Sequence, residues 1–306
     1  MPYRLLAAIL ALGLLAGCAQ SAAADSRPAV VTAFYPLEFL SRSLGGDRIA
    51  VTNLTKPGAE PHDVELNPRQ VGLISDAALV VYLHGFQPAV DEAVGQEAAD
   101  RAFDVGTAVE LLPIAAEDGH DHVPGEGEHA EAAGGRDPHV WLDPVRFAAI
   151  TDALGERLAG TDPAHAADYR ARAVAVHREL DTLNAEFAAG LRDCARREIV
   201  TSHEAFHYLA DRYGLTEIGI TGVSPEAEPA PRRLAEVARE ARAAGTTTIF
   251  FETLVSPKVA DTIAREVGAR TAVLDPLEGL TRPGTDYFSV MRSNLAALEQ
   301  ALGCTA

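Results

Sequence analysis

Cysteine, positive charge and long apolar runs are all scarce in this chain of 306 residues, and each shortage excludes a class of protein. The three cysteines form no Cys-x-x-Cys pattern, which argues against a thiolate zinc finger or a redox pair. Lys and Arg number 26 against 44 Asp and Glu, and the net charge of −18 argues against nucleic acid as a partner because phosphates would be repelled. The sequence has no Gly-rich phosphate loop and no nucleophile elbow, so nucleotide binding and acyl transfer have no support.

The remaining composition is that of a folded protein. Hydrophobic residues make up 47% and charged residues 23%, which excludes a mainly disordered chain. The length exceeds what one minimal core needs, so we expect two domains or lobes.

The N-terminus predicts export. An apolar run from Leu5 to Ala16 is too short to anchor a helix across a bilayer and indicates a secretory signal. Small residues directly before Cys18 are typical of a lipobox, in which residues 1–18 are the signal, Cys18 carries the lipid and residues 19–27 form a tether. The alternative is an ordinary signal peptide cleaved within residues 22–24. No later apolar run is long enough to cross a membrane.

Export makes a disulfide possible. With Cys18 carrying a lipid, Cys194 and Cys304 remain as an even pair, and we predict that they are bridged. The alternative is two buried thiols.

Short β-rich segments alternate with helical ones, which predicts α/β architecture with mainly parallel sheets. The expected strands are 29–34, 49–54, 78–83, 198–202, 246–252 and 271–274. Capping side chains before proline predict helix starts at Asn67-Pro68, Asp143-Pro144, Asp162-Pro163 and Ser256-Pro257.

One segment, residues 161–194, is rich in Ala, Arg, Glu and Leu and predicts a single helix of about 30 residues, too long for an ordinary crossover. We expect it to be a rigid link between two similar lobes, residues 28–160 and 195–306.

Four metal-binding side chains stand at the ends of expected strands or before expected helices. They are His62, His139, His203 and Asp275, two in each half of the chain. Because ligands bind at the carboxyl ends of parallel strands, we expect these residues to meet in a cleft between the lobes. Three imidazoles and one carboxylate suit Zn²⁺ in four-coordinate geometry, whereas Mn²⁺ prefers more oxygen ligands.

A second group of histidines lies in a long segment, residues 117–136, that has almost no core-forming residues. It is expected to be a surface loop. Its His120, His122 and His129, with acidic residues between them, suit weak and exchangeable zinc capture. The alternative is a solvated acidic spacer with incidental histidines.

Residues 203–207 match H-E-x-x-H, the zinc-protease signature, in which both histidines lie in one helix and the Glu is the base. Here His203 directly follows an expected strand, and no third ligand follows at the usual short spacing. An exported zinc hydrolase that uses Glu204 is therefore the minor alternative. His207 is expected to pack near the cleft, His84 is unassigned, and His165 and His177 are expected on a solvated helix face.

Taken together, the segments around these residues resemble a known family. They are residues 32–37 (TAFYPL), 58–63 (GAEPHD), 137–144 (DPHVWLDP), 201–206 (TSHEAF) and 274–277 (LDPL). In this order they resemble the zinc-specific solute-binding lipoproteins of ABC transporters, a metal-binding group that also includes manganese binders. The resemblance covers nearly all of residues 29–303.

The resemblance implies two α/β lobes joined by a long helix, with Zn²⁺ between them on His62, His139, His203 and Asp275. It implies a monomeric extracytoplasmic receptor, held to the membrane by lipid on Cys18, that delivers zinc to an ABC permease and its ATPase and has no enzymatic activity. Manganese relatives typically carry a carboxylate where this chain has His203, so a manganese or iron receptor is the alternative within the family. An adhesin or metal chaperone with the same fold is another.

Overall fold

The structure, a computed structural model, describes residues 26–114, 135–282 and 284–305. Cys18 and the loop histidines His120, His122 and His129 lie outside the described residues. Among the described residues, no helix has the length and apolar character that a bilayer-spanning segment requires.

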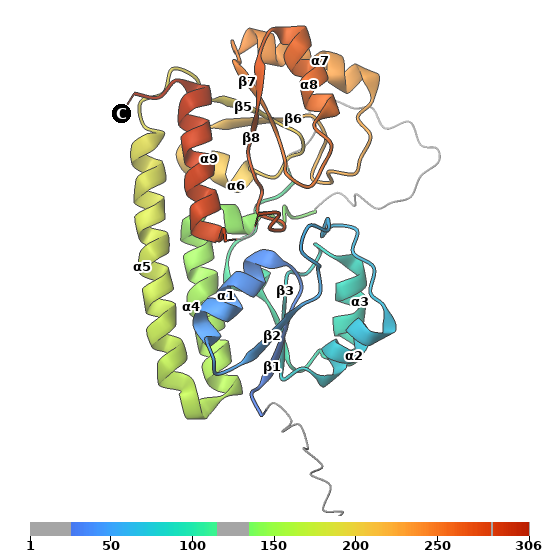
Figure 1. Cartoon of the computed structure of the whole chain (residues 1–306), viewed down its shortest axis with the longest axis vertical. Coiled ribbons are helices and arrows are strands. Elements are labelled where there is room, and N and C mark those ends of the chain that lie inside the picture. The colour runs from blue at the N-terminus through green and yellow to red at the C-terminus, as the bar shows by residue number, and fades with distance from the viewer. Residues whose placement is uncertain (1–25, 115–134, 283, 306) are drawn as a thin grey trace, which may run out of the picture.

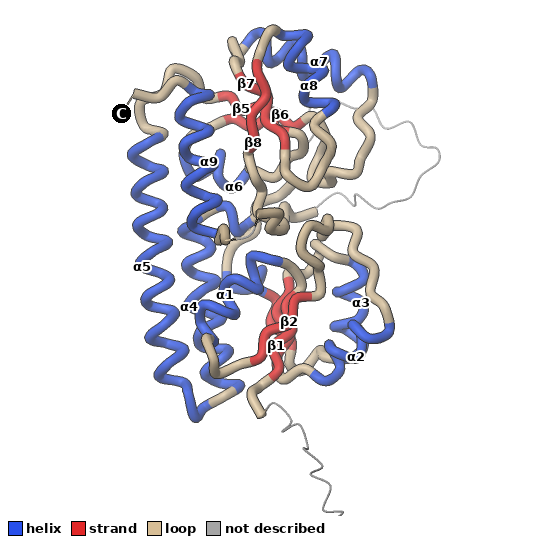
Figure 2. The backbone as a smooth tube through the Cα atoms, in the orientation of Figure 1, coloured by secondary structure: helices blue, strands red, loops and turns tan. Residues whose placement is uncertain are grey.

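Two lobes follow one another along the chain (Figures 1 and 2). The elements of the first lobe are β1 (Ala29–Thr32), α1 (Tyr35–Gly45), β2 (Ala50–Asn53), α2 (Pro68–Asp76), β3 (Leu79–Tyr82), α3 (Pro88–Glu97), β4 (Ala102–Asp104) and α4 (Pro144–Thr161). The long helix α5 (Ala166–Gly190) links them to β5 (Glu198–Thr201), α6 (His207–Tyr213), β6 (Thr216–Gly219), α7 (Pro231–Ala243), β7 (Thr248–Phe251), α8 (Lys258–Val267), β8 (Arg270–Val273) and α9 (Tyr287–Leu302).

Each lobe contains a four-stranded parallel sheet, and both sheets have the same strand order. The orders are β2-β1-β3-β4 and β6-β5-β7-β8. The register aligns Val30 with Val51 in the first sheet and Val200 with Ile218 in the second. In each sheet the earliest strand lies between the next two, which opens a crevice at the carboxyl ends of the strands. These ends face the middle of the molecule from both lobes (Figure 1).

Helix α5 runs alongside both lobes and packs against α1, α4 and α9 (Figure 1). Its 25 residues give a length of about 37 Å at 1.5 Å per residue. Leu180, Leu183 and Phe187 on one face of α5 are fully buried, while Val174 is 48% exposed. The helix is therefore amphipathic and holds both lobes through its apolar face.

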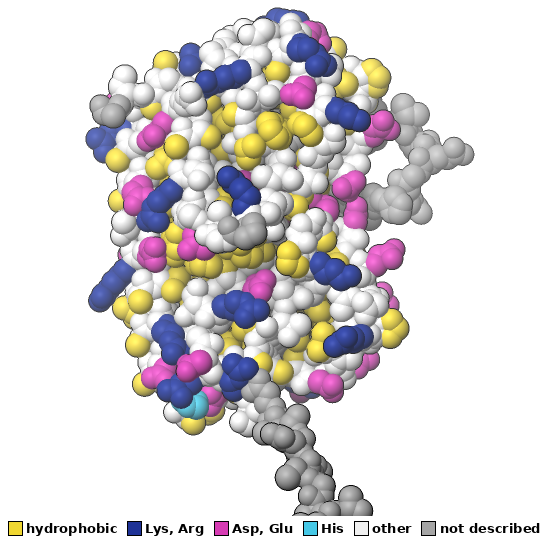
Figure 3. All heavy atoms as spheres, in the orientation of Figure 1, with side chains coloured by type: hydrophobic (Ala, Val, Ile, Leu, Met, Phe, Trp, Pro, Cys, Tyr) yellow, Lys and Arg dark blue, Asp and Glu magenta, His cyan; other side chains and the backbone are white. Residues whose placement is uncertain are grey.

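The apolar core is continuous across the linker. One buried cluster includes Val81 in the first sheet, Leu180 on α5, and Met291 and Leu298 on α9. A smaller cluster lies in the second lobe and includes Val200, Val237 and Ile263. On the surface, acidic and basic side chains are interspersed over the face drawn in Figure 3.

The fold class predicted from the sequence is confirmed. The structure differs from the predictions in two strands, in the start of the linking helix and in two of the helix caps. The short strands β4 and β6 were not expected. The linking helix begins at Ala166 rather than near residue 161, because a 3-10 turn, Pro163–His165, reverses the chain after α4. The cap at Asp143 forms, as does a full capping box at Asn67.

The other two predicted caps do not form. Asp162 makes no capping bond to the backbone of the turn and instead accepts hydrogen bonds from His165 and Tyr169. Helix α8 begins after Pro257 without a side-chain cap.

A disulfide joins Cys194, just beyond α5, to Cys304, just beyond α9. Backbone hydrogen bonds from Arg196 to Leu302 and from Thr305 to Asp193 run beside it. The sequence separation is 110 residues, so the bridge closes a loop that contains the entire second sheet. A cross-link that closes a long loop restricts the unfolded chain strongly.

The double variant Cys194→Ser/Cys304→Ser should lose about 2–5 kcal/mol of unfolding free energy, because the unfolded chain regains the entropy of that loop. Denaturant unfolding with and without the substitutions measures this. Wild-type protein under reducing conditions should match the variant, and equal stability of oxidised wild type and variant would contradict the stabilising role.

Candidate metal site

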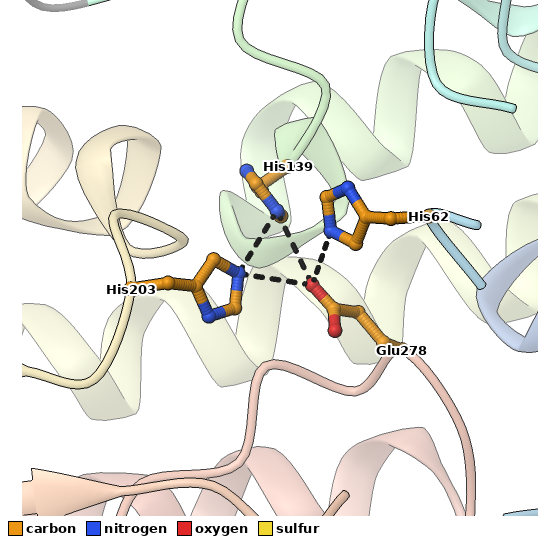
Figure 4. Close-up of side chains that lie close together, drawn as sticks. All are labelled: His62, His139, His203 and Glu278. Carbon is orange, nitrogen blue, oxygen red and sulfur yellow. Dashed lines mark hydrogen bonds and ion pairs between the residues drawn. The ribbon is translucent and has the colours of Figure 1, made fainter. Parts of the chain in front are cut away.

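Four side chains converge in the cleft between the lobes: His62, His139, His203 and Glu278 (Figure 4). One potential ligand atom from each lies within 4.8 Å of all the others. The Nε2 atoms of the three histidines are each 3.2 Å from Glu278 Oε1. His203 Nε2 is 3.4 Å from His139 Nε2.

These separations match the edges of a tetrahedron around one ion. Zinc bonds of about 2.0–2.1 Å to nitrogen and oxygen place neighbouring ligands about 3.3 Å apart. The observed 3.2–3.4 Å between ligand atoms brackets that value. Four of the six separations within the group therefore fit a four-coordinate cation, and the two between His62 and the other imidazoles lie within 4.8 Å.

Each of the four side chains lies in a different segment between helices and strands. His62 lies in the loop between β2 and α2, and His139 precedes the turn that leads into α4. His203 follows β5, and Glu278 lies between β8 and α9. Two ligands thus come from each lobe.

Two buried carboxylates orient two of the imidazoles. His139 Nδ1 is 2.8 Å from Asp137 Oδ1, and His203 Nδ1 is 2.6 Å from Glu252 Oε1. Ser202 also donates a hydrogen bond to Glu252. With Nδ1–H held by a carboxylate, Nε2 of each ring is directed at the centre of the cluster, and the ring becomes a more basic ligand.

The site requires positive charge at its centre. His139 and His203 are fully buried and Glu278 is 1% exposed. Burial opposes ionisation of Glu278, but the three histidines, His203 foremost, hold the pKa of its carboxyl well below the ordinary value. Glu278 Oε2 is buried and makes no hydrogen bond to any described residue.

Neighbouring carboxylates favour the protonated form of two of the three imidazoles. Burial opposes protonation of His139, but the charge of Asp137 and its hydrogen bond raise the histidine pKa to about 9. Burial likewise opposes protonation of His203, but Glu252 and Glu278 raise its pKa. For His62 burial dominates, and its pKa is lowered. A cation at the centre would replace the protons on Nε2 and leave those on Nδ1 in place.

The structure does not bring Asp275 into the cluster, which corrects the sequence-based expectation. Asp275 Oδ1 accepts a hydrogen bond from the Leu277 amide, and Oδ2 accepts one from Thr253. It therefore holds the turn that presents Glu278, in which Leu277 has a left-handed φ of 61°. The sequence signal for Glu278 was its place in the same loop, three residues further on.

Aromatic residues wall the site on the side of the first lobe. Phe86 packs edge-on against His62, with ring centroids 4.6 Å apart, and Trp141 lies beside His139 at 5.4 Å. Trp141 Nε1 donates to the carbonyl of Pro276, which ties the His139 segment to the Glu278 loop. Phe34 and Phe206 are fully buried in the core.

The other histidines lie outside the cluster. His84 has a 70% exposed side chain and pairs with Asp91. His165 and His177 pair with acidic neighbours on the helical side of the molecule. His207 is the first residue of α6, whereas His203 precedes that helix, so the two histidines do not share a helix as the protease signature requires.

Fold and site together define the class. The molecule is a two-lobed α/β binding protein whose cleft is built to hold one metal ion. The family model described as "Zinc-uptake complex component A periplasmic" matches residues 30–301. The chain therefore belongs to this zinc-uptake family.

Individual relatives agree with that assignment. The chain is 36% identical over 305 residues to the zinc-binding lipoprotein AdcA of Streptococcus pneumoniae, a match that covers 97% of this chain and 60% of that protein. It is 33% identical over 303 residues to the high-affinity zinc uptake system protein ZnuA of Bacillus subtilis, covering 94% of each. The chain thus spans less than two thirds of AdcA but nearly all of that ZnuA.

The solved structure of the Zn(II)-bound ZnuA-like domain of S. pneumoniae AdcA is similar to the whole described fold. The TM-score is 0.75 at 32% identity, and the match covers 90% of this chain and 99% of that domain.

Glu278→Gln should weaken zinc binding by at least about 100-fold, because it removes a charged ligand. We expect this loss to exceed the loss caused by removing a residue that only hydrogen-bonds to a ligand. Asp275→Asn is the matched control, because it makes the same carboxylate-to-amide change three residues away. It should alter zinc affinity by less than about 10-fold, which is the smallest loss typical of residues that hydrogen-bond to a metal ligand. Competition with a chromophoric chelator measures both. A larger loss in Asp275→Asn than in Glu278→Gln would show that the wrong carboxylate has been chosen.

Glu252→Gln should weaken zinc binding by about 10–100-fold although Glu252 is not itself a ligand, because His203 loses the charged acceptor of its Nδ1 proton. The same chelator competition applies. Glu179→Gln, on the half-exposed outer face of α5, serves as the control. Equal affinities for the two variants would exclude a role of Glu252 in orienting His203.

Proposed function

We propose that this protein captures Zn²⁺ outside the cytoplasm and delivers it to an ABC permease for import. The single observation that carries the proposal is the convergence of three imidazoles on one carboxylate oxygen, at 3.2 Å from each Nε2 atom, with all four ligand atoms within 4.8 Å of one another. The ligands are His62, His139, His203 and Glu278.

The donor set favours zinc over manganese or iron. Three nitrogens and one oxygen in a tetrahedral arrangement suit Zn²⁺, whereas Mn²⁺ prefers oxygen ligands and octahedral geometry. The buried aromatic wall beside His62 and His139 leaves little room for further oxygen ligands on that side.

The ion is cargo rather than a catalytic centre. A catalytic zinc keeps a position open for water, and four protein ligands fill a tetrahedral sphere. The arrangement therefore supports binding and release, and we propose no enzymatic activity.

Capture and release exchange a cation for protons at the same nitrogen atoms. Zn²⁺ displaces the protons on Nε2, while Asp137 and Glu252 retain the protons on Nδ1 and keep both rings aimed at the centre. Release requires that one ligand leave. All four ligands lie in loops or turns outside the α-helices and strands, so movement of any of these segments can withdraw a ligand.

The cellular setting follows from the N-terminal sequence and the relatives. We propose that residues 1–18 are removed, that lipid on Cys18 anchors a monomer to the extracytoplasmic face of the membrane, and that a permease and its ATPase accept the zinc. AdcA of S. pneumoniae is named a lipoprotein and ZnuA of B. subtilis a zinc uptake protein, which supports this setting. In the same proposal, His120, His122 and His129 bind zinc weakly and exchangeably.

Metal-free protein of residues 27–306 should bind one Zn²⁺ tightly and Mn²⁺ at least about 100-fold more weakly, because the ligand set lacks the oxygen donors that Mn²⁺ prefers. His203→Ala should remove the tight zinc step. Titration of both metals against a competing chelator measures this, with His177→Ala, on α5 and outside the cluster, as control. Tighter binding of Mn²⁺, or an intact zinc step in His203→Ala, would overturn the proposal.

A further inference from the structure

Two buried tyrosines of the second lobe hold the backbone on either side of His139, a ligand from the first lobe. The hydroxyl of Tyr208, on α6, donates to the carbonyl of Asp137 at 2.7 Å. The hydroxyl of Tyr287, on α9, donates to the carbonyl of Trp141, also at 2.7 Å. Both tyrosines are fully buried. The two carbonyls stand two residues before and two residues after the ligand, so the second lobe holds its backbone from both sides.

Two further contacts tie the same segment, residues 137–143, to the second lobe. Trp141 Nε1 donates to the carbonyl of Pro276, in the loop between β8 and α9. At the end of the segment, Arg212 on α6 makes two hydrogen bonds, of 3.0 and 2.8 Å, to the buried carboxylate of Asp143. Together with the two tyrosine hydroxyls, these contacts join the segment to the second lobe at four points.

The segment that carries His62 has a different set of hydrogen bonds. They are local or go to the first lobe, as in the bond from Gln87 Nε2 to the carbonyl of Pro61. Among the described residues, hydrogen bonds from residues 55–63 reach the second lobe only through the contact of His62 Nε2 with Glu278. Zinc would take the place of that contact, so nothing else of this kind would hold the segment to the second lobe.

The geometry of the cluster shows the same division (Figure 4). The ring centroids of His139 and His203 are 5.2 Å apart, whereas that of His62 lies 5.4 and 5.8 Å from theirs. The His62 side chain is 11% exposed, and the other two imidazoles are fully buried. His62 is therefore the imidazole that solvent reaches.

Unfilled space lies beside the His62 segment. A cavity of about 370 Å³ is lined by residues 55–57 of that segment, by α1, and by Glu278 and Gly279 on the opposite side. Tightly packed interiors resist movement, whereas a segment next to a cavity can shift without displacing packed side chains. The His62 segment thus has both fewer attachments and more room than the segment around His139.

We propose that Tyr208 and Tyr287 are positioning residues for His139. They hold it beside the two second-lobe ligands as a preassembled group of three, and His62 completes the coordination on capture and is the first ligand to leave on release. This inference rests on the proposed function, because it concerns the order in which the same four ligands engage zinc. Three ligands fixed before the ion arrives lose little conformational freedom on binding, and withdrawal of the fourth opens a position on the ion.

The positioning role is tested by Tyr208→Phe and Tyr287→Phe, which remove only the hydroxyl groups. In residues 27–306, each should weaken zinc binding by about 10-fold in chelator competition, because the backbone that carries His139 loses an anchor. In a His139→Ala background, measured with a weaker chelator, the same substitutions should have no further effect, because the ligand through which they act is absent. A merely structural role would give the same loss in both backgrounds.

Tyr213→Phe is the matched control on the same helix as Tyr208. The Tyr213 hydroxyl donates to Asn184 on α5, away from the cluster, so its removal should leave zinc affinity unchanged. Circular dichroism checks that each variant is folded.

The order of engagement is tested by stopped-flow rates of zinc binding and of zinc transfer to a chelator. His62→Ala should leave the association rate constant unchanged, because zinc first meets the group of three ligands. It should speed dissociation by at least about 100-fold, because the sphere stays open. His203→Ala, which removes a member of the group, should slow association.

Three outcomes would overturn the inference. They are unchanged zinc affinity in both tyrosine variants, an equal loss of affinity in the His139→Ala background, and slower association in His62→Ala. Absence of a tight zinc step in the unsubstituted protein would instead overturn the proposed function, so the two failures are distinguishable.

Discussion

The arrangement of this protein depends on an electrostatic requirement at one oxygen atom. Glu278 Oε1 is surrounded at 3.2 Å by three imidazole nitrogens, two of them on fully buried side chains. Neither the carboxylate nor the imidazoles can be satisfied by one another unless positive charge lies between them. Protons or one metal ion can provide it, and the tetrahedral spacing favours the ion. Asp137 and Glu252 lie at the Nδ1 atoms of His139 and His203, and their negative charge also favours positive charge on these rings.

The surrounding fold keeps these groups in place. The apolar core runs without interruption from the first sheet through α5 to α9, so the lobes cannot swing apart without exposing buried surface. Helix α5 and the disulfide at its end add a second constraint on the far side of the second lobe. Movement on release is therefore expected in the loops that carry the ligands, whose backbone is not fixed by sheet or helix hydrogen bonds.

Much of this could be predicted from the sequence, and the failures have physical reasons. Val- and Ile-rich segments identified six of the eight strands that the structure describes, whereas β4 has only three residues and β6 has one apolar β-branched residue, Ile218. The three histidines were recognisable because each follows a strand or precedes a capped helix. The fourth ligand was placed at Asp275 because it directly follows its strand, but a turn held by Asp275 itself directs the Glu278 carboxylate into the cluster. Which of two acids in one loop faces the ion depends on backbone dihedral angles that composition does not reveal.

The identical strand order of the two lobes has a consequence for how the affinity arises. Each lobe offers a crevice of the same kind, but each contributes only two ligands, His62 and His139 from one and His203 and Glu278 from the other. A separated lobe would be a bidentate chelator with modest affinity. Because a continuous core joins the two crevices, the four donors are brought together when the chain folds. Zinc binding therefore does not have to meet the entropic cost of assembling them. The strength of zinc binding is in this sense a chelate effect built by the connection between the lobes, and loosening that connection would weaken binding without altering a single ligand.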